Sequence, residues 1–175
     1  GYRVNDRTNE FRRSSYYLTC DRVNGVLTVY TDSTMRIPIK TIRVSVGKAG
    51  TETPTGTWTM HRAGRWQELM GPSWGQYGTH VVNGIFVHSV ACGQANSYNL
   101  PVGEYLRLGN PASHGCIRAC VADAKWVWDN CNGSKIRIFD GTYTSNEALK
   151  GPLGRKALTP LRGSKNFDPT DPACK

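Results

Sequence analysis

The chain has 175 residues, 38% of them hydrophobic and 20% charged, which is typical of one globular domain with its own core. No apolar run reaches the roughly 18 residues of a transmembrane helix, so we expect no membrane span in this chain. Lysine and arginine outnumber aspartate and glutamate by 22 to 13, and the charge of +9 fits a solvated surface or an anionic partner, while the lack of a basic helix argues against nucleic acid.

The first part of the chain predicts β-strands. Residues 1–15 are polar and are expected to form an extended lead-in, after which three runs rich in Tyr, Val, Ile and Thr follow. Asn24-Gly25 separates the first two runs and is a strong hairpin signal. Pro38 lies inside the third run, which predicts an edge strand or a bulge there.

Later segments predict further strands and one helix. "TWTMHR", "THVVNGIFVHS" and "KIRIFDG" have the composition of strands, whereas residues 63–77 show no clear period. Residues 91–112 form a long connection without a period, which we expect to be a functional lid. "VADAKWVWDNC" is the clear helix, with Asp123 in its first turn and Asn-Gly closing it at 132–133. The tail from Thr142 onward is rich in Pro and Gly and is expected to be irregular.

Six cysteines are many for a cytosolic enzyme of this size, and none belongs to a CxxC pair. An oxidising, extracytoplasmic setting explains this number best. The chain starts at Gly1 without an apolar leader, but a leader or an anchor can be cleaved from a longer precursor. We therefore expect an extracytoplasmic protein, in the cell wall or secreted.

The stretch "PASHGCIRAC" gathers groups that can activate a thiol. Cys116 has His114 two residues before it and the predicted helix soon after it, and both can stabilise a thiolate. Gly115 permits a sharp turn, so that the amides of Gly115 and Cys116 can face one point as an oxyanion hole. Arg118 keeps its positive charge and suits a carboxylate of the substrate.

A second histidine strengthens this interpretation. His88 ends the apolar run "GIFVH" and is followed at once by Ser89. A base at the end of a strand, facing a cysteine supplied by a turn, is a common arrangement in enzymes that transfer acyl groups. Ser89, or its carbonyl, can hold the imidazole in the useful tautomer.

With these residues the sequence resembles the L,D-transpeptidase catalytic domain, or YkuD-type, family of bacterial cell-wall enzymes. The resemblance covers about residues 16–140 and rests on "VSVGKAGTETPTGTWTM", "GIFVHS" and, most specifically, "SHGCIR". It implies domain boundaries of 1–15 for the lead-in, 16–140 for the catalytic domain and 141–175 for a tail packed on it. It also implies a mainly β fold, a sandwich or open barrel of mixed strands with one principal helix after the cysteine.

The resemblance also implies the reaction. Cys116 is the nucleophile, His88 its base and Ser89 the residue that orients the base, while His114 and Gly115 shape the oxyanion region. Cys116 attacks the carbonyl carbon of the peptide bond before the terminal D-alanine of a peptidoglycan stem. A second stem then accepts the acyl group to give a 3–3 cross-link. Arg118 is expected to bind the substrate with Ser113 beside it. Tyr98 and Tyr105 are further candidates from their residue type alone, which can line a substrate groove or simply cover apolar surface. No cofactor or metal is needed, the chain is expected to be a monomer, and carbapenems are expected to acylate the cysteine.

Other functions stay open on the sequence. With water as acceptor the same residues give an L,D-carboxypeptidase, and a sortase-like transpeptidase also runs His, Cys, Arg but lacks an SHGC motif. A wall-binding module without catalysis is a further alternative, against which the intact motif argues. His88, Cys92, His114 and Cys116 form a legal zinc ligand set, but the HxC spacing is awkward for chelation.

Two disulfides are expected among the remaining cysteines. Cys92 and Cys120 each lie four residues after a predicted catalytic residue, so they leave the site from neighbouring points and are expected to bond. Cys20 and Cys174 lie near the two termini, and a bridge between them would pin the tail to the sheet. Cys131 then stays a buried free thiol, because the predicted helix holds it roughly 16 Å from Cys120, against a usual Cα limit of about 7 Å.

Overall fold

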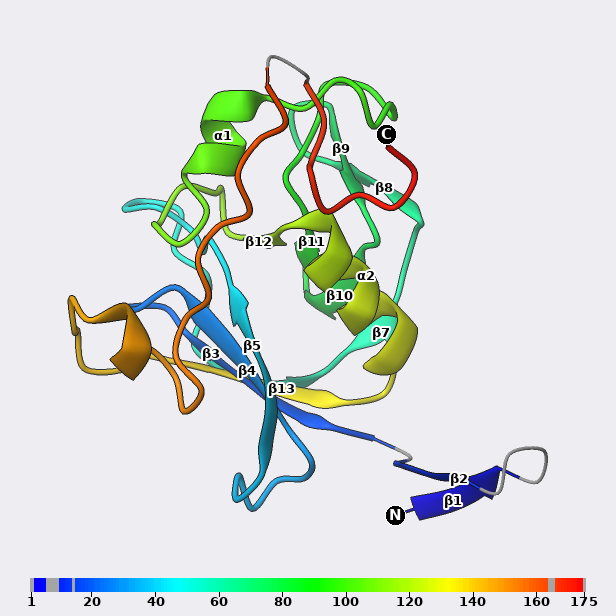
Figure 1. The fold of residues 1–175 in the computed structure, drawn as a ribbon, viewed down its shortest axis with the longest axis vertical. Coiled ribbons are helices and arrows are strands. Elements are labelled where there is room, and N and C mark those ends of the chain that lie inside the picture. Colours follow the sequence, from blue (N-terminus) through cyan, green and yellow to red (C-terminus); the bar gives the residue numbers. More distant parts are fainter. Residues whose placement is uncertain (1, 6–9, 14, 164–165, 175) are drawn as a thin grey trace.

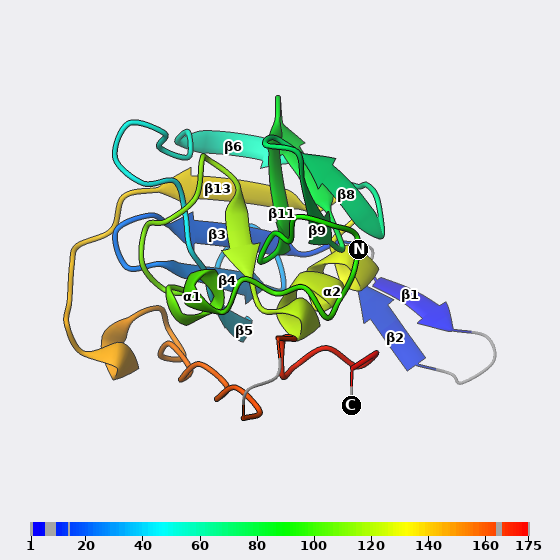
Figure 2. The same cartoon turned by 90° about the horizontal axis from the view of Figure 1, so that it is seen from above.

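The computed structural model of the chain describes residues 2–5, 10–13, 15–163 and 166–174. Within these residues the fold is mainly β, and Figure 1 shows two sheets with one main helix packed beside them. The larger sheet contains, in spatial order, β5 (Pro38–Arg43), β4 (Val26–Tyr30), β3 (Tyr17–Asp21), β13 (Lys135–Phe139) and β6 (Gly56–Thr59), an order that Figure 2 shows from above. The smaller sheet contains β12 (Ile117–Ala119), β11 (Ile85–Ser89), β10 (Thr79–Val82) and β7 (His61–Arg62).

The other elements are short or peripheral. Two hairpins are β1 (Tyr2–Asn5) with β2 (Glu10–Arg13) and β8 (Trp66–Leu69) with β9 (Ser73–Gln76). The helices are α1 (Val102–Leu106), α2 (Val121–Asn130) and the 3₁₀ turn η1 (Glu147–Leu149). The helix α2 is the one that the sequence predicts, and it packs on β11. No helix in the described part of the chain is long and apolar enough to cross a membrane.

Local signals in the sequence account for several of these strands. Gly25 takes a φ of +60° in the turn between β3 and β4, which confirms the predicted hairpin. Pro38 begins β5, an edge strand, and the register of the β4–β5 pair shifts beside it, so both predicted features occur. Strand directions are mixed, because β13 runs parallel to β3 and β12 parallel to β11.

The main core lies between the two sheets and the inner face of α2. It is built from apolar side chains that alternate along the strands, and each contributes by leaving water. Its fully buried members include Leu18, Leu27, Ile42, Met60, Ile117 and Ile136.

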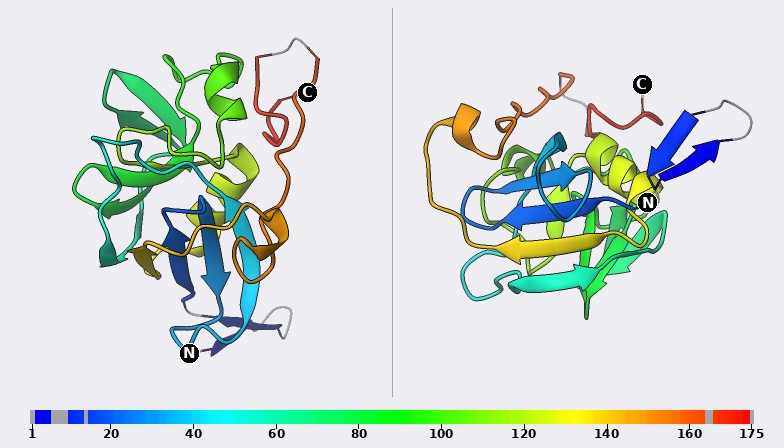
Figure 3. Two further views of the ribbon diagram at one scale, coloured as in Figure 1. Left: turned by 90° about the vertical axis from the view of Figure 1, so that its left-hand side faces the viewer. Right: turned by 90° about the horizontal axis from the view of Figure 1, so that it is seen from below.

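Residues 91–112, predicted as a lid, pack instead under the C-terminal tail. Leu100, Tyr105 and Leu108 form a second small core with Val90, and the tail residue Leu158 packs against it. Figure 3 shows the tail, coloured from orange to red, running along the outside of the fold in both views. The expected lid is therefore wrong for this segment, whose apolar side chains point into a core.

The two expected disulfides are not present, because all six cysteines are free. After Ser89, the last residue of β11, Cys92 forms a backbone bridge with Trp74 on β9. Cys120 instead leads into α2, and its Sγ lies 3.2 Å from Asp123 Oδ2. Cys92 and Cys120 thus have different partners and are not bonded to each other.

The second expected disulfide fails for a similar reason. Cys20 is fully buried in the main core on β3, whereas Cys174 ends the tail beside the 91–101 segment. The two thiols therefore lie in different parts of the molecule.

Candidate active site

The parallel pairing of β11 with β12 brings the two predicted catalytic residues to one face. Val87 lies opposite Ile117 and His88 opposite Arg118. Because side chains alternate along a strand, Val87 and Ile117 enter the core while His88 and Arg118 face the other way. Cys116 directly precedes β12 and lies beside Phe86 on that same face.

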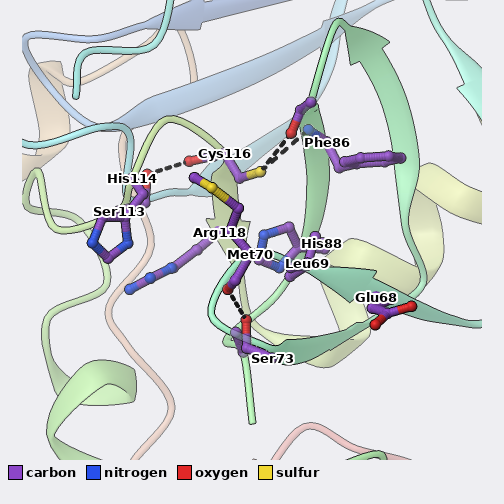
Figure 4. A pocket seen from close by; sticks show the side chains of 12 residues that line it. Glu68, Leu69, Met70, Ser73, Phe86, His88, Ser113, His114, Cys116 and Arg118 are labelled. Carbon is purple, nitrogen blue, oxygen red and sulfur yellow. Dashed lines mark hydrogen bonds between the residues drawn. The ribbon is translucent and has the colours of Figure 1, made fainter. Parts of the chain in front are cut away.

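Cys116 and His88 open into a common pocket of about 280 Å³ (Figure 4). Its wall combines the β8–β9 hairpin, β11 and the cysteine turn, and its lining residues are Glu68, Leu69, Met70, Ser73, Gly84, Phe86, His88, Ala91, Ser113, His114, Cys116 and Arg118. In Figure 4 the Met70 side chain lies next to Cys116 at the mouth of the pocket. The two groups that acyl transfer requires therefore share one enclosed space.

The thiol of Cys116 is held by backbone groups. The N–H of Phe86 donates to Sγ at 3.4 Å, and the thiol donates to the carbonyl of Gly84 at 3.5 Å. Burial raises the pKa of this thiol, and the Phe86 N–H and the Arg118 charge oppose that effect only in part. Cys116 is thus a neutral thiol at rest, and its pKa is not lowered by the groups that the sequence offered for this.

His88 is almost completely buried and is fixed by its neighbour. Its Nδ1–H donates to the carbonyl of Ser89, so the other nitrogen, Nε2, carries the free lone pair. Burial lowers the pKa of His88 to about 4, against the effect of the Ser89 carbonyl, and the Arg118 charge lowers it further. The imidazole is therefore neutral and presents a base, and Ser89 orients it through its carbonyl rather than its hydroxyl.

The turn that carries Cys116 is locked by two hydroxyl groups. Ser113 Oγ accepts the N–H of Gly115 at 3.1 Å and donates to the carbonyl of Cys116 at 2.6 Å. Thr53 Oγ1 donates to the carbonyl of Gly115 at 2.6 Å. Gly115 has a φ of +127°, and a Cβ there would lie 2.9 Å from Ile85 Cδ1.

These bonds correct one expectation. The amide of Gly115 is already bonded to Ser113 Oγ, so it is not free for an oxyanion hole. Gly115 serves the turn through its backbone conformation instead. His114 is exposed and lines the pocket, and the hydrogen bonds of the thiol go instead to Phe86 and Gly84.

Arg118 lines the pocket and is held by two residues outside it. Its Nη1 pairs with Glu104 Oε2 of α1 at 2.9 Å, and its backbone pairs with Ser45 in both directions. Its Nε is buried and has no hydrogen-bond partner among the described residues. The cationic guanidinium of Arg118 lines the pocket, and a carboxylate is the group that such a cation suits.

Two residues predicted to bind substrate lie elsewhere. Tyr105 is fully buried in the second core, where its hydroxyl donates to the carbonyl of Thr159 at 2.5 Å. Tyr98 is exposed and packs edge-on against Phe167, outside the residues that line the pocket. Neither tyrosine lines the pocket of Cys116, because the 91–112 segment that carries them packs under the tail.

The residues considered for zinc are not arranged as a set of metal ligands. Cys92 pairs with β9, His114 is exposed, and His88 is bonded to Ser89. The described part of the chain holds no group of three or more His, Cys, Asp or Glu side chains placed for a metal ion.

Comparison with known proteins identifies the family. The L,D-transpeptidase catalytic domain (YkuD) matches residues 15–151. The chain belongs to this family.

Individual relatives are similar over shorter or more divergent stretches. The putative L,D-transpeptidase YciB of Bacillus subtilis (strain 168) is 59% identical over 27 residues, 15% of this chain and 14% of that protein. An L,D-transpeptidase from Mycobacterium smegmatis has a TM-score of 0.51 at 22% identity, over 71% of this chain and 58% of that one. L,D-transpeptidase 3 from Mycobacterium tuberculosis, solved with a faropenem-derived adduct, has a TM-score of 0.52 at 18% identity, over 72% and 60%. This chain thus spans less than two thirds of each, and the two structures support the fold.

Sequence reasoning missed one wall of the pocket of this L,D-transpeptidase domain. Glu68, Leu69, Met70 and Ser73 come from the β8–β9 hairpin, a region without a clear period. Met70 is 82% exposed, an unusual position for a large apolar side chain. "ELMGPS", an apolar pair followed by Gly-Pro, is a turn signal that could have located the hairpin tip.

Proposed function

We propose that this domain is a peptidoglycan L,D-transpeptidase that works through a thioester on Cys116. The observation that carries the proposal is the placement of Cys116 and a neutral, buried His88 on one face of the β11–β12 pair, in one pocket. Family membership supplies the reaction class, and the net charge of +9 suits an anionic wall. The site of action is then extracytoplasmic.

Acylation follows from the resting protonation states. Cys116 Sγ attacks the carbonyl before the terminal D-alanine while its proton passes to His88 Nε2. Because burial lowers the pKa of His88 to about 4, the imidazolium is short-lived and gives its proton to the departing amine of D-alanine. The C–S bond forms, the C–N bond breaks, and D-alanine leaves with the proton.

Deacylation reverses the roles. The side-chain amine of a second stem attacks the thioester, His88 Nε2 takes the amine's proton, and this proton returns to the departing sulfur. A 3–3 cross-link forms and the thiol is restored. Of the two amides expected to bind the oxyanion, that of Gly115 is engaged by Ser113, so we assign the oxyanion to the N–H of Cys116.

Arg118 is assigned to the substrate carboxylate. Its cationic guanidinium lines the pocket, while Glu104 binds Nη1 and fixes the orientation of the side chain. The carboxylate of the terminal D-alanine is the group of a donor stem that such a cation would bind.

A carbapenem labels the acyl-enzyme directly. The intact mass of the protein should rise by one carbapenem, and the adduct should be lost in Cys116→Ala but kept in Cys120→Ala, the matched control. An unmodified wild-type protein, or an adduct that survives in Cys116→Ala, would contradict the proposal. A tetrapeptide stem with and without an amine acceptor then separates cross-linking from an L,D-carboxypeptidase, which would release D-alanine equally in both.

A further inference from the structure

The C-terminal segment, residues 166–174, is bonded to two elements beside the active site. Asp168 Oδ2 accepts the N–H of Val121 at 2.8 Å, and Thr170 Oγ1 accepts that of Ala122 at 3.0 Å, so both cap the start of α2. Asp171 reaches the other way, and its Oδ2 accepts Gln76 Nε2 of β9 at 3.0 Å. In Figure 1 this red segment lies beside α2 and β9.

The contact between Asp171 and Gln76 is buried. Asp171 is 4% exposed and Gln76 3% exposed. Burying a carboxylate costs free energy unless its oxygens are bonded, and here the second oxygen accepts the N–H of Ala173. A buried, bonded carboxylate has few alternative positions, so Asp171 holds Gln76 in place.

Gln76 is in turn bonded to the residue that fixes the base. Its backbone N–H donates to Ser89 Oγ at 2.8 Å, also within the protein interior. The carbonyl of the same Ser89 accepts Nδ1–H of His88. Three successive hydrogen bonds therefore connect Asp171 with His88, through Gln76 and Ser89.

The neighbour of Gln76 touches the imidazole itself. A Cβ built on Gly75 would lie 2.6 Å from His88 Nδ1 and 2.9 Å from Cγ, which means that the ring rests on the glycine backbone. The position of β9 therefore sets the position of the imidazole from one side, and Ser89 sets it from the other. A small shift of β9 would change both contacts at once.

We propose that Gln76 and Asp171 are positioning residues for His88, and that the C-terminal segment locks the catalytic base through them. The proposal rests on the function proposed above, in which His88 is the base. Neither residue lines the pocket, so both act through Ser89 and β9 and not on the substrate.

The test compares changes that remove the bond between Asp171 and Gln76 with a change at the neighbouring Thr170. Asp171→Ala and Gln76→Met each remove the buried bond, whereas Asp171→Asn can keep it, because a turned Gln76 amide can accept from the new amide. Thr170→Val removes a cap of α2 and leaves the bond between Asp171 and Gln76 in place, so it is the matched control for simple loss of stability.

Two measurements are made on each folded variant. One is the rate of carbapenem acylation of Cys116, and the other is the ring ¹⁵N and Nδ1–H resonance of His88, assigned by its loss in His88→Gln. We expect Asp171→Ala and Gln76→Met to slow acylation about ten- to a hundred-fold and to shift or broaden the His88 signal. Asp171→Asn should restore most of both, and Thr170→Val should lower the melting temperature and leave both nearly unchanged.

Unchanged His88 resonances and rates in Asp171→Ala and Gln76→Met would overturn the inference, as would equal losses in Thr170→Val. If Asp171→Ala does not fold, the acylation rates and His88 resonances of Gln76→Met and Asp171→Asn still test the inference. A wild-type protein that no carbapenem acylates would count against the proposed function alone, because the His88 resonance tests the positioning without any reaction.

Discussion

The imidazole of His88 on β11 rests on the backbone of Gly75 on β9, so closely that an added Cβ would lie 2.6 Å from Nδ1 and 3.0 Å from the Cβ of His88. Atoms of real side chains do not approach so closely, so one of the two residues would have to move. A strand that takes no part in the pocket's chemistry thus determines where the base lies.

Gly75→Ala should therefore reduce activity more than stability. The new methyl group would collide with the imidazole and displace it, and overpacking of this kind costs about 1–3 kcal/mol of folding free energy. We expect acylation of Cys116 to slow by about a hundred-fold, since a displacement of about 1 Å can cost that much. Carbapenem acylation measured by intact mass, with urea unfolding for stability, checks both.

The control for this substitution is Gly103→Ala. Gly103 lies in α1, and an added Cβ there would have no atom within 4 Å. Alanine also favours a helix over glycine by about 1 kcal/mol, so this variant should be as active as the wild type and slightly more stable. Equal acylation rates in the two alanine variants would show that Gly75 does not restrict His88.

The pH dependence of Cys116 alkylation should show a neutral pair. Burial raises the pKa of Cys116 and lowers that of His88 to about 4, so imidazolium and thiolate do not coexist in the resting site. The thiolate fraction then grows about ten-fold with each pH unit from neutral upward, and the iodoacetamide rate should follow it. A rate that is already level between about pH 5 and 8 would indicate an ion pair instead.

Sequence patterns predicted the strands and indicated the two proposed catalytic residues because their signals are local. Asn24-Gly25 predicts a turn by itself, and "SHGCIR" and "GIFVH" each hold their reactive residues within a few adjacent positions. That Cys116 and His88 share a face depends on the β11–β12 register, which two segments separated by a long connection form only in the folded chain.

The differences between expectation and structure have the same origin. Tyr98, Tyr105 and the expected lid lie on a long connection whose position depends on the tail that packs over it. The β8–β9 hairpin gave no periodic signal because its buried residues, Gly75 and Gln76, are adjacent and neither is apolar and large. Contacts between β9, the tail and His88 join residues far apart in the sequence, which no short motif can indicate.

The unfolded chain should expose six thiols without any reductant. All six cysteines are free, whereas the two expected disulfides would leave only two. Titration with Ellman's reagent in denaturing guanidinium, on protein purified under non-reducing conditions, counts them. A count of four would show that one disulfide forms in solution, and peptide mapping would then identify its two cysteines.

The Thr53 hydroxyl should prove necessary for the cysteine turn. It accepts the N–H of Gly47 at 2.9 Å and donates to the carbonyl of Gly115 at 2.6 Å, in a fully buried position. Thr53→Val keeps the shape and removes both bonds, which leaves two backbone groups unpaired at about 1–3 kcal/mol each. The strained φ of Gly115 can then relax and carry Cys116 with it, so acylation should fall together with the free energy of unfolding.

Thr53→Ser separates the hydroxyl from the methyl group. It keeps both hydrogen bonds and loses one buried methyl, at about 1 kcal/mol, so its acylation rate should stay near that of the wild type. Urea unfolding measures the free energy of unfolding of both variants, and carbapenem acylation measures the reactivity of Cys116 in each. If valine supports acylation as fast as serine does, then Ser113 alone is enough to hold the turn, because its hydroxyl bonds both the N–H of Gly115 and the carbonyl of Cys116.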